Sequence, residues 1–152
     1  MKITINEWLY HYIQDRQQFR KLYSFLKKVM ERCDKLIFKY GSPLMRKIWE
    51  ISKQSQHWEP QRRILARYLL DAFIKNSEKA EILYTNEVGS IPEELVHVVP
   101  QDDIYLVEAA LATEDRVILT TDRKLKEILA PYSQIKAVLV EDFLPKYLEK
   151  DQ

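Results

Sequence analysis

The sequence contains only two glycines, Gly41 and Gly89, in 152 residues. This scarcity excludes the glycine-rich phosphate loops of both the P-loop and the dinucleotide-binding type. The single cysteine, Cys33, excludes an internal disulfide and a cysteine-based zinc site, and we expect it to be a small buried apolar group. No apolar run approaches the ~20 residues that cross a bilayer, and the N-terminal residues do not read as a signal peptide. The default expectation is a cytoplasmic protein without membrane association.

An excess of charge of one sign is also lacking. The chain has 24 Lys and Arg against 23 Asp and Glu, a formal net charge of +1. No global field therefore argues for nucleic acid or membrane, and local patches must carry any such argument. The length is typical of one domain, and we predict a single domain over residues 1–152 with enough apolar residues for a core.

Short runs rich in Val, Ile and Leu recur along the chain, at residues 3–5, 36–38, 82–84, 117–119 and 137–140. Stretches with apolar residues at helical spacing separate them. Alternation of strands and helices predicts an α/β fold: a parallel sheet of about five strands with helices on both faces, in three layers.

The helical stretches also predict which side chains face the core. After Pro43 the inward set is expected to be Leu44, Met45, Ile48 and Trp49. After Pro60 it is expected to be Ile64, Leu65, Tyr68, Leu69, Ala72 and Phe73. Residues 85–101 are long for a loop, so we expect this segment to be partly structured or functional.

Polar residues gather where predicted strands end. Asn6 and Glu7 follow the first strand, Thr120 to Asp122 follow the fourth, and Asp102 and Asp103 precede the helix before the fourth strand. Ligands of open parallel sheets bind beyond the carboxyl ends of the strands, so these groups are candidates for one site. Oxygen ligands of this kind suit Mg²⁺, which usually takes one or two protein carboxylates plus waters and phosphate.

A simpler interpretation applies to the same aspartates. An aspartate before an apolar helix is most often an N-cap, which stabilises by ~0.5–2 kcal/mol. Capping alone explains either Asp102 or Asp103, and it also explains Asp122. Both interpretations stay open from the residues themselves.

Residues 100–113 and 117–125 together resemble the C-terminal half of a PIN domain. The resemblance lies in an acidic residue before a Leu/Ala-rich helix, a short apolar strand, and the Thr-x-Asp-x-x-Leu pattern of Thr120, Asp122 and Leu125. The resemblance implies a parallel five-stranded sheet flanked by helices. It also implies the activity of a magnesium- or manganese-dependent ribonuclease, and many proteins of that family are toxins of toxin–antitoxin pairs. It also implies that Asp103 (or Asp102) and Asp122 occupy two acidic positions of the family, and that Thr120 helps to order the site.

The first half of the chain departs from that family. The resemblance implies an aspartate after the first strand, where this chain has Asn6, followed by Glu7. It also implies a glutamate on the helix after the second strand, where Lys47 falls nearest and Glu50 lies about one turn later. Asparagine offers a carbonyl oxygen without charge, and a lysine repels a cation but can contact a phosphate.

Three hypotheses follow. The first is a PIN-type ribonuclease that uses Mg²⁺ or Mn²⁺, with Asp103, Asp122, Glu7 and Asp102 as catalytic residues and Asp103, Asp122, Asn6 and Glu7 as the metal ligands. The second is a degenerate PIN-like domain that binds RNA or a protein partner without cleavage. The third is an α/β domain of another superfamily, such as a phosphate-transfer receiver, which the strand order would distinguish.

The partners expected under the first hypothesis are RNA, an antitoxin or other protein partner, and a second copy in a homodimer. Thr120, Arg123 and Lys47 are the candidate substrate-binding residues. Basic residues off the apolar stripe could line an RNA path, because phosphate contacts dominate nucleic-acid affinity; these are Arg62, Arg63, Arg67, Lys75, Arg123, Lys124 and Lys126. For each of them taken singly, a solvated helix face is the alternative.

Overall fold

The computed structural model describes residues 1–149, and its centre is a five-stranded sheet. All neighbouring strands are parallel and the order across the sheet is β3-β2-β1-β4-β5. The strands are β1 (Lys2–Ile5), β2 (Lys35–Lys39), β3 (Ala80–Leu83), β4 (Val117–Thr120) and β5 (Lys136–Leu139).

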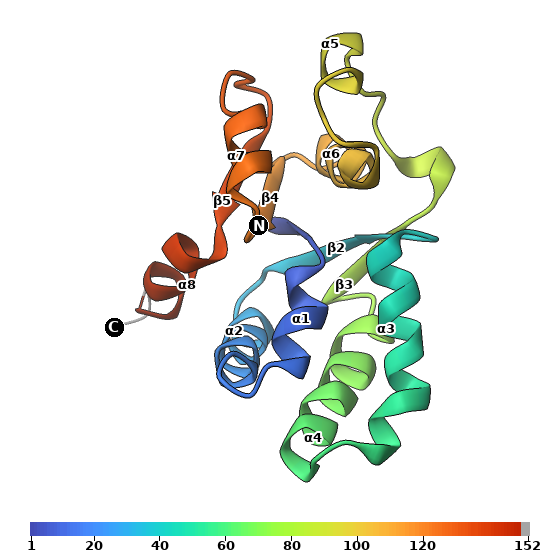
Figure 1. Ribbon diagram of the computed structural model, residues 1–152, viewed down its shortest axis with the longest axis vertical. Helices are drawn as coiled ribbons and strands as arrows, with labels where there is room; N and C mark the ends of the chain where they lie inside the picture. The colour runs from blue at the N-terminus through green and yellow to red at the C-terminus, as the bar shows by residue number, and fades with distance from the viewer. Residues whose placement is uncertain (150–152) are drawn as a thin grey trace.

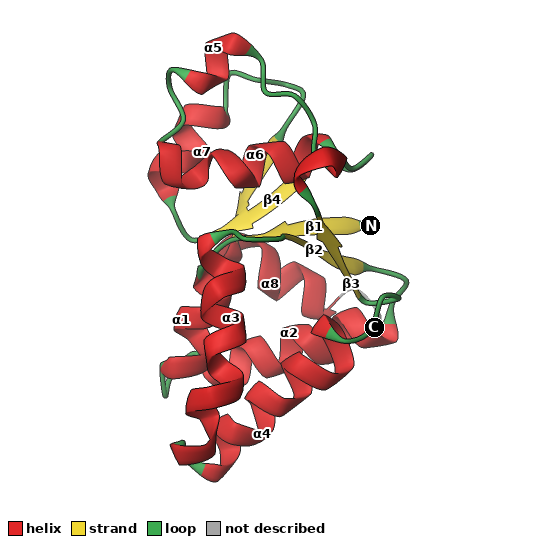
Figure 2. Cartoon of the chain, turned by 90° about the vertical axis from the view of Figure 1, so that its right-hand side faces the viewer, coloured by secondary structure: helices red, strands yellow, loops and turns green. Residues whose placement is uncertain are grey.

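Helices cover both faces of the sheet, as Figures 1 and 2 show. Below it lie α1 (Trp8–Gln14), α2 (Phe19–Glu31), α3 (Pro43–Gln54), α4 (Pro60–Tyr68) and α8 (Val140–Glu149), with a π-helical turn, Leu69–Ile74, after α4. Above it lie α5 (Glu93–Val96), α6 (Ile104–Leu111) and α7 (Arg123–Leu129). The α/β three-layer fold predicted from the sequence is confirmed.

Two apolar cores hold these layers together. Ile3 and Ile5 of β1 face the lower layer and pack with the fully buried Phe25 of α2. Ile118 of β4 faces the upper layer and packs with residues of α6 and α7. Because both faces are covered, the strands are apolar along most of their length, as parallel strands usually are.

From β1 the chain adds β2 and β3 on one side of the sheet and then β4 and β5 on the other, so the strand order switches between β1 and β4. β1 pairs with β2 on one side and with β4 on the other, so Thr4 lies between Ile37 and Ile118. Such a switch point opens a crevice at the carboxyl ends of the two strands, where α/β proteins bind ligands. The order also differs from the 2-1-3-4-5 order of receiver domains, so the receiver named as an example under the third hypothesis is excluded.

Some local expectations were wrong. Trp49 and Ile64 were predicted to face the core but are 45% and 62% exposed, because the buried face of α3 includes Ile51 instead of Trp49 and that of α4 includes Ala66 instead of Ile64. Cys33 was predicted to be buried and is exposed. The expectation for residues 85–101 is confirmed, since they include the 3₁₀ turn Thr85–Glu87 and the short helix α5. None of the described helices is long and apolar enough to cross a membrane.

Candidate functional site

The ends of β1 and β4 are held together by the hydroxyl of Thr120, a side chain that is fully buried. The amide nitrogen of Asn6 donates to Thr120 Oγ1 at 2.8 Å, and the backbone N–H of Asp122 donates to the same oxygen at 3.0 Å. Asn6 Oδ1 in turn accepts from the backbone N–H of Glu7 at 2.6 Å. Thr120 therefore fixes the loop after β1 against the loop after β4.

Asp122 begins helix α7 as its N-cap. Its Oδ1 accepts from the backbone N–H groups of Lys124 and Leu125, at 3.0 and 3.2 Å, so the capping interpretation is confirmed for this residue. Within residues 1–149, no hydrogen bond reaches the second carboxylate oxygen, Oδ2. The cap holds the carboxylate in place while leaving one oxygen available for a ligand.

Asp103 behaves differently. It immediately precedes α6 at the end of the 3₁₀ turn Gln101–Asp103, but its side chain makes no capping hydrogen bond, so the capping interpretation is wrong for it. Burial raises the pKa of its carboxyl group, and the charges of Asp122, Glu7 and Asp102 raise the pKa further. The structure thus places Asp103 within electrostatic reach of the other acidic residues predicted for the site.

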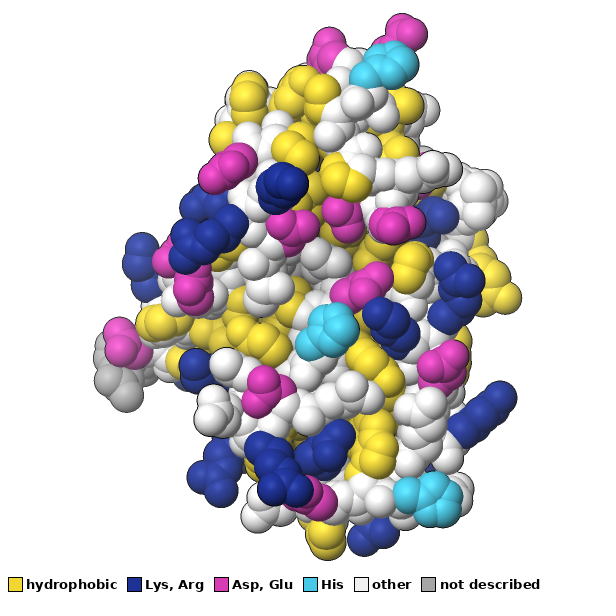
Figure 3. Space-filling view, viewed as in Figure 1, with side chains coloured by type: hydrophobic (Ala, Val, Ile, Leu, Met, Phe, Trp, Pro, Cys, Tyr) yellow, Lys and Arg dark blue, Asp and Glu magenta, His cyan; other side chains and the backbone are white. Residues whose placement is uncertain are grey.

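Acidic side chains are gathered on one face of the molecule. Figure 3 shows acidic side chains gathered across the middle of one face, between the upper and lower helical layers. We call the group of Asp103, Asp122, Glu7 and Asp102 the acidic cluster. It joins α6, α7 and the loop after β1, segments that are far apart in the sequence.

Lys47 neutralises part of this cluster. Its Nζ lies 2.7 Å from Glu7 Oε2, with both side chains about one-third exposed, and 5.7 Å from the centre of the Tyr10 ring. Lys47 lies on α3, the helix after β2. The resemblance to PIN domains implied a glutamate on this helix, and the structure has the ammonium group of Lys47 there instead. Glu50 lies exposed on the same helix.

Sequence reasoning missed Tyr105, which follows Asp103 by two residues. Its side chain is buried, and its hydroxyl has no hydrogen-bond partner among the described residues. Burial raises its pKa, and the charges of Glu7 and Asp103 raise it further, so the hydroxyl stays protonated beside the acidic cluster. A buried donor without a partner is costly and points to a ligand or water that accepts from it. The sequence indicated only that Tyr105 lies on a helix, and not that its hydroxyl is buried near the acidic cluster.

The donor set limits which cation the cluster could hold. Within residues 1–149, no three His, Cys, Asp or Glu side chains are arranged so that they could bind a metal ion together. Glu7 is engaged by Lys47, and Asn6 Oδ1 already accepts a hydrogen bond. Asp103 and Asp122 remain, and two carboxylates with waters and a phosphate are a usual set for Mg²⁺. These residues therefore fit a two-carboxylate site rather than the fuller shell expected from the sequence.

The basic residues proposed for an RNA path are partly engaged elsewhere. Arg123 pairs with Glu141, and Arg67 pairs with Asp71. Arg62 Nε donates to the carbonyl of Ile13 at 3.0 Å and its guanidinium group lies over the Trp58 ring. These contacts make Arg62 a structural residue of the lower layer.

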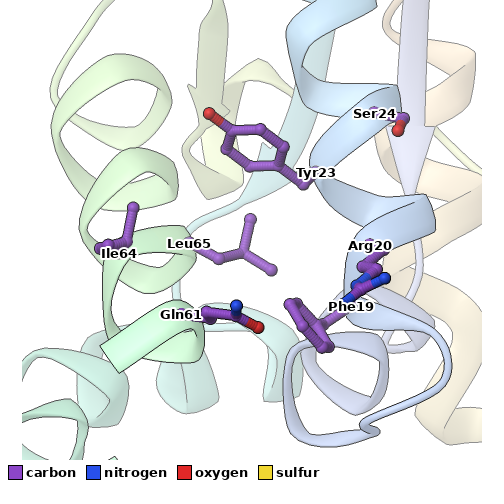
Figure 4. Close-up of a pocket in the computed structure, with 7 residues that line it drawn as sticks. All are labelled: Phe19, Arg20, Tyr23, Ser24, Gln61, Ile64 and Leu65. Carbon is purple, nitrogen blue, oxygen red and sulfur yellow. The ribbon is translucent and has the colours of Figure 1, made fainter. Parts of the chain in front are cut away.

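A hollow lies in the lower layer, between α2 and α4. It has a volume of about 390 Å³, and Figure 4 shows the residues around it, which are Phe19, Arg20, Tyr23, Ser24, Gln61, Ile64 and Leu65. The exposed Ile64 forms part of its wall, which explains why this apolar residue is not in the core. No residue of the acidic cluster lines it.

Comparison with solved structures identifies a similar fold. The chain resembles one in the crystal structure of VapBC2 from Rickettsia felis bound to a DNA fragment from their promoter, with a TM-score of 0.54 and 14% identity. The similarity covers 91% of this chain and 98% of that chain. The sequence matches no protein-family model and no curated protein. At this level of identity the likeness shows the fold alone, a five-stranded parallel sheet flanked by helices.

The central role of Thr120 can be tested by Thr120→Val. Valine keeps the shape but removes the acceptor of two hydrogen bonds, so we expect the free energy of unfolding to fall by about 1–3 kcal/mol in urea titrations. The neighbouring Thr121 is exposed, and Thr121→Val should change stability by less than about 0.5 kcal/mol. Equal stability of the two variants would contradict the role assigned to the buried hydroxyl.

Proposed function

We propose that this protein is a PIN-like ribonuclease that binds single-stranded RNA at the carboxyl edge of its sheet and cleaves it with the help of Mg²⁺ or Mn²⁺. The observation that carries the proposal is that Thr120 ties Asp122 to the end of β1 at the switch point of the sheet, where the charge of Asp122 helps to raise the pKa of Asp103. Asp103 has no capping role, so a cation that offsets the repulsion between the two carboxylates gives it a function.

Each residue of the crevice has a part in this proposal. Asp122, fixed by its cap, and Asp103 would hold the ion, which when bound supplies an activated water and stabilises the leaving oxygen of a phosphodiester. Thr120 aligns the loop that carries Asp122. The hydroxyl of Tyr105, buried near Asp103, stays protonated and adds no negative charge to the site. Lys47, beside Glu7, places a positive charge next to the incoming strand.

A protein partner belongs to the same proposal. The similar fold comes from a structure described as a VapBC2 complex bound to promoter DNA. We propose by analogy that this protein acts as the toxin of a toxin–antitoxin pair, held inactive by an antitoxin.

The Lys47–Glu7 ion pair favours a second candidate function. An ammonium group 2.7 Å from Glu7 brings a positive charge to the acidic cluster without an ion. Under this candidate the protein binds RNA or a protein partner without cutting, and Lys47 replaces the ion.

Calorimetric titration with Mn²⁺ separates the two candidates. The ribonuclease proposal expects micromolar binding that Asp103→Ala removes. Lys47→Met keeps the length of the side chain but releases Glu7, so it should tighten Mn²⁺ binding about tenfold. Lys53→Met, which changes an exposed lysine of the same helix, is the matched control and should bind as the unmodified protein does. Failure of both the unmodified protein and Lys47→Met to bind Mn²⁺ would favour the non-cutting candidate.

A further inference from the structure

Two exposed tyrosines stand side by side at the carboxyl ends of β2 and β3. Tyr40 is 56% exposed and Tyr84 is 52% exposed, although both are large and largely apolar. Their ring centres are 5.0 Å apart and the ring planes are inclined by 34°. The pair therefore presents an extended aromatic surface to solvent.

The backbone holds both tyrosines firmly. The N–H of Tyr40 donates to the carbonyl of Leu83 at 2.8 Å, which extends the pairing of β2 with β3. Gly41 follows at φ +75°, a conformation that favours glycine, and closes the turn into α3. Tyr84 is fixed by Glu87, whose Oε1 accepts from the Tyr84 N–H at 3.1 Å and whose own N–H donates to the Tyr84 carbonyl at 2.9 Å. Little backbone freedom remains to be lost on binding.

The pair lies on the same edge of the sheet as the acidic cluster. Strand register pairs Lys39 with Leu83, and continuing the pairing of β1 with β2 sets Asn6 level with Lys39. Tyr40 and Tyr84 therefore stand one residue beyond the level of Asn6. Adjacent strands are ~4.8 Å apart, so β3 lies roughly 10 Å from β1, a span of about three stacked nucleotides.

The surroundings of the pair suit a nucleic acid strand. Lys39 ends β2 beside the pair, and Arg46 is exposed on the first turns of α3, which begins just after it. Neither forms an ion pair with another of the described residues. Exposed aromatic rings bind any base through its π-face, while nearby cations hold the backbone of the strand.

We infer that Tyr40 and Tyr84 form a base-stacking subsite that positions single-stranded RNA along the carboxyl edge of the sheet, next to the acidic cluster. The inference rests on the proposed function and adds to it the chemistry that recognises the substrate. The subsite binds unpaired bases, because stacking on the two tyrosines needs an exposed base face. A duplex is therefore not a ligand, since its base faces are covered by neighbouring base pairs.

Fluorescence anisotropy with a labelled single-stranded RNA of about ten nucleotides tests the inference, in buffer without divalent ions so that no cleavage occurs. Tyr40→Ala and Tyr84→Ala should each weaken binding at least about fivefold, whereas Tyr40→Phe and Tyr84→Phe keep the ring and should stay within about twofold. Tyr23→Ala, which removes a tyrosine 36% exposed on α2, is the matched control and should not change affinity. On a strand of the same length with abasic sites throughout, the alanine variants and the unmodified protein should bind equally.

The outcomes separate this inference from the proposed function. If the unmodified protein binds the RNA and the alanine variants bind it equally well, the stacking subsite is overturned while the proposed function stands. Unchanged RNA affinity together with altered self-association in sedimentation would make the pair a protein contact, which also overturns the inference. If the unmodified protein binds no single-stranded RNA, the proposed function fails and the subsite fails with it.

Discussion

Asp122→Asn is expected to abolish manganese-dependent cleavage of single-stranded RNA, with at least about a hundredfold loss of rate. Asparagine caps helices as well as aspartate does, so the bonds to Lys124 and Leu125 can be kept and the fold should be retained. The substitution removes the negative charge and one of the two carboxylates in the proposed ion site. This variant is therefore expected to lose its cleavage activity but to keep its fold.

The measurement is a cleavage assay on a labelled RNA strand, with thermal unfolding measured on the same sample. Glu127→Gln is the matched control, because Glu127 is an exposed acidic residue of the same helix and should not affect cleavage. Undiminished cleavage by Asp122→Asn would remove Asp122 from the mechanism. Contaminating nuclease is excluded if Asp103→Ala, purified in the same way, is inactive.

Asp34→Asn is expected to lower the free energy of unfolding at neutral pH by about 2–4 kcal/mol. Asp34 lies before β2 and is almost buried; its Oδ1 accepts from the Met1 ammonium at 2.8 Å, and its Oδ2 accepts from the Tyr147 hydroxyl at 2.6 Å. Asparagine provides a single acceptor and no charge, so one of these donors loses its partner. The loss corresponds to roughly 5–15 °C in melting temperature.

The pH dependence of this effect has a definite sign. Burial raises the pKa of Asp34, but hydrogen bonds from the N-terminal ammonium and Tyr147 outweigh it, so the pKa is lowered overall. A lowered pKa gives stability that is present above the unfolded value of about 3.9 and is lost as the pH falls through the folded value. The stabilities of the unmodified protein and Asp34→Asn should therefore begin to converge below about pH 4, and converge further as the pH falls through the lowered pKa of Asp34.

Urea unfolding at several pH values measures this convergence. Asp142→Asn, at an exposed residue whose carboxylate lies 4.0 Å from the Lys126 ammonium, is the matched control and should cost less than about 1 kcal/mol. A difference between the unmodified protein and Asp34→Asn that persists unchanged to acid pH would contradict the charged role of Asp34.

The alternation of strands and helices was readable from the sequence because each element carries its own local pattern. Apolar runs such as residues 117–119 gave the strands, and the alternation gave the parallel sheet. The same periodicity misplaced Trp49 and Ile64, because apolar residues at helical spacing show that a helix has an inner face but not which residues at its margins are buried. In the structure, Ile64 lines the hollow between α2 and α4.

The local sequence pattern could not predict which of the two aspartates caps its helix. Asp122 and Asp103 both precede a helix, and nothing local distinguishes them. Asp122 proved to be a cap, whereas Asp103 makes no capping bond and lies among like charges instead. The difference lies in the backbone: Asp122 has the extended ψ of 103° typical of an N-cap, whereas Asp103 has a ψ of −2° in the helical region.

By itself the sequence determined the α/β class, the strand ends at which polar residues gather, and the departure of Asn6 and Lys47 from a nuclease pattern. Only the tertiary structure decided that Lys47 pairs with Glu7 and that the hydroxyl of Tyr105 is buried without a partner. It alone also set Tyr40 beside Tyr84. The physical reason is that a parallel sheet aligns strands that are distant in the chain, so the neighbours of each strand end are fixed by register and not by local sequence.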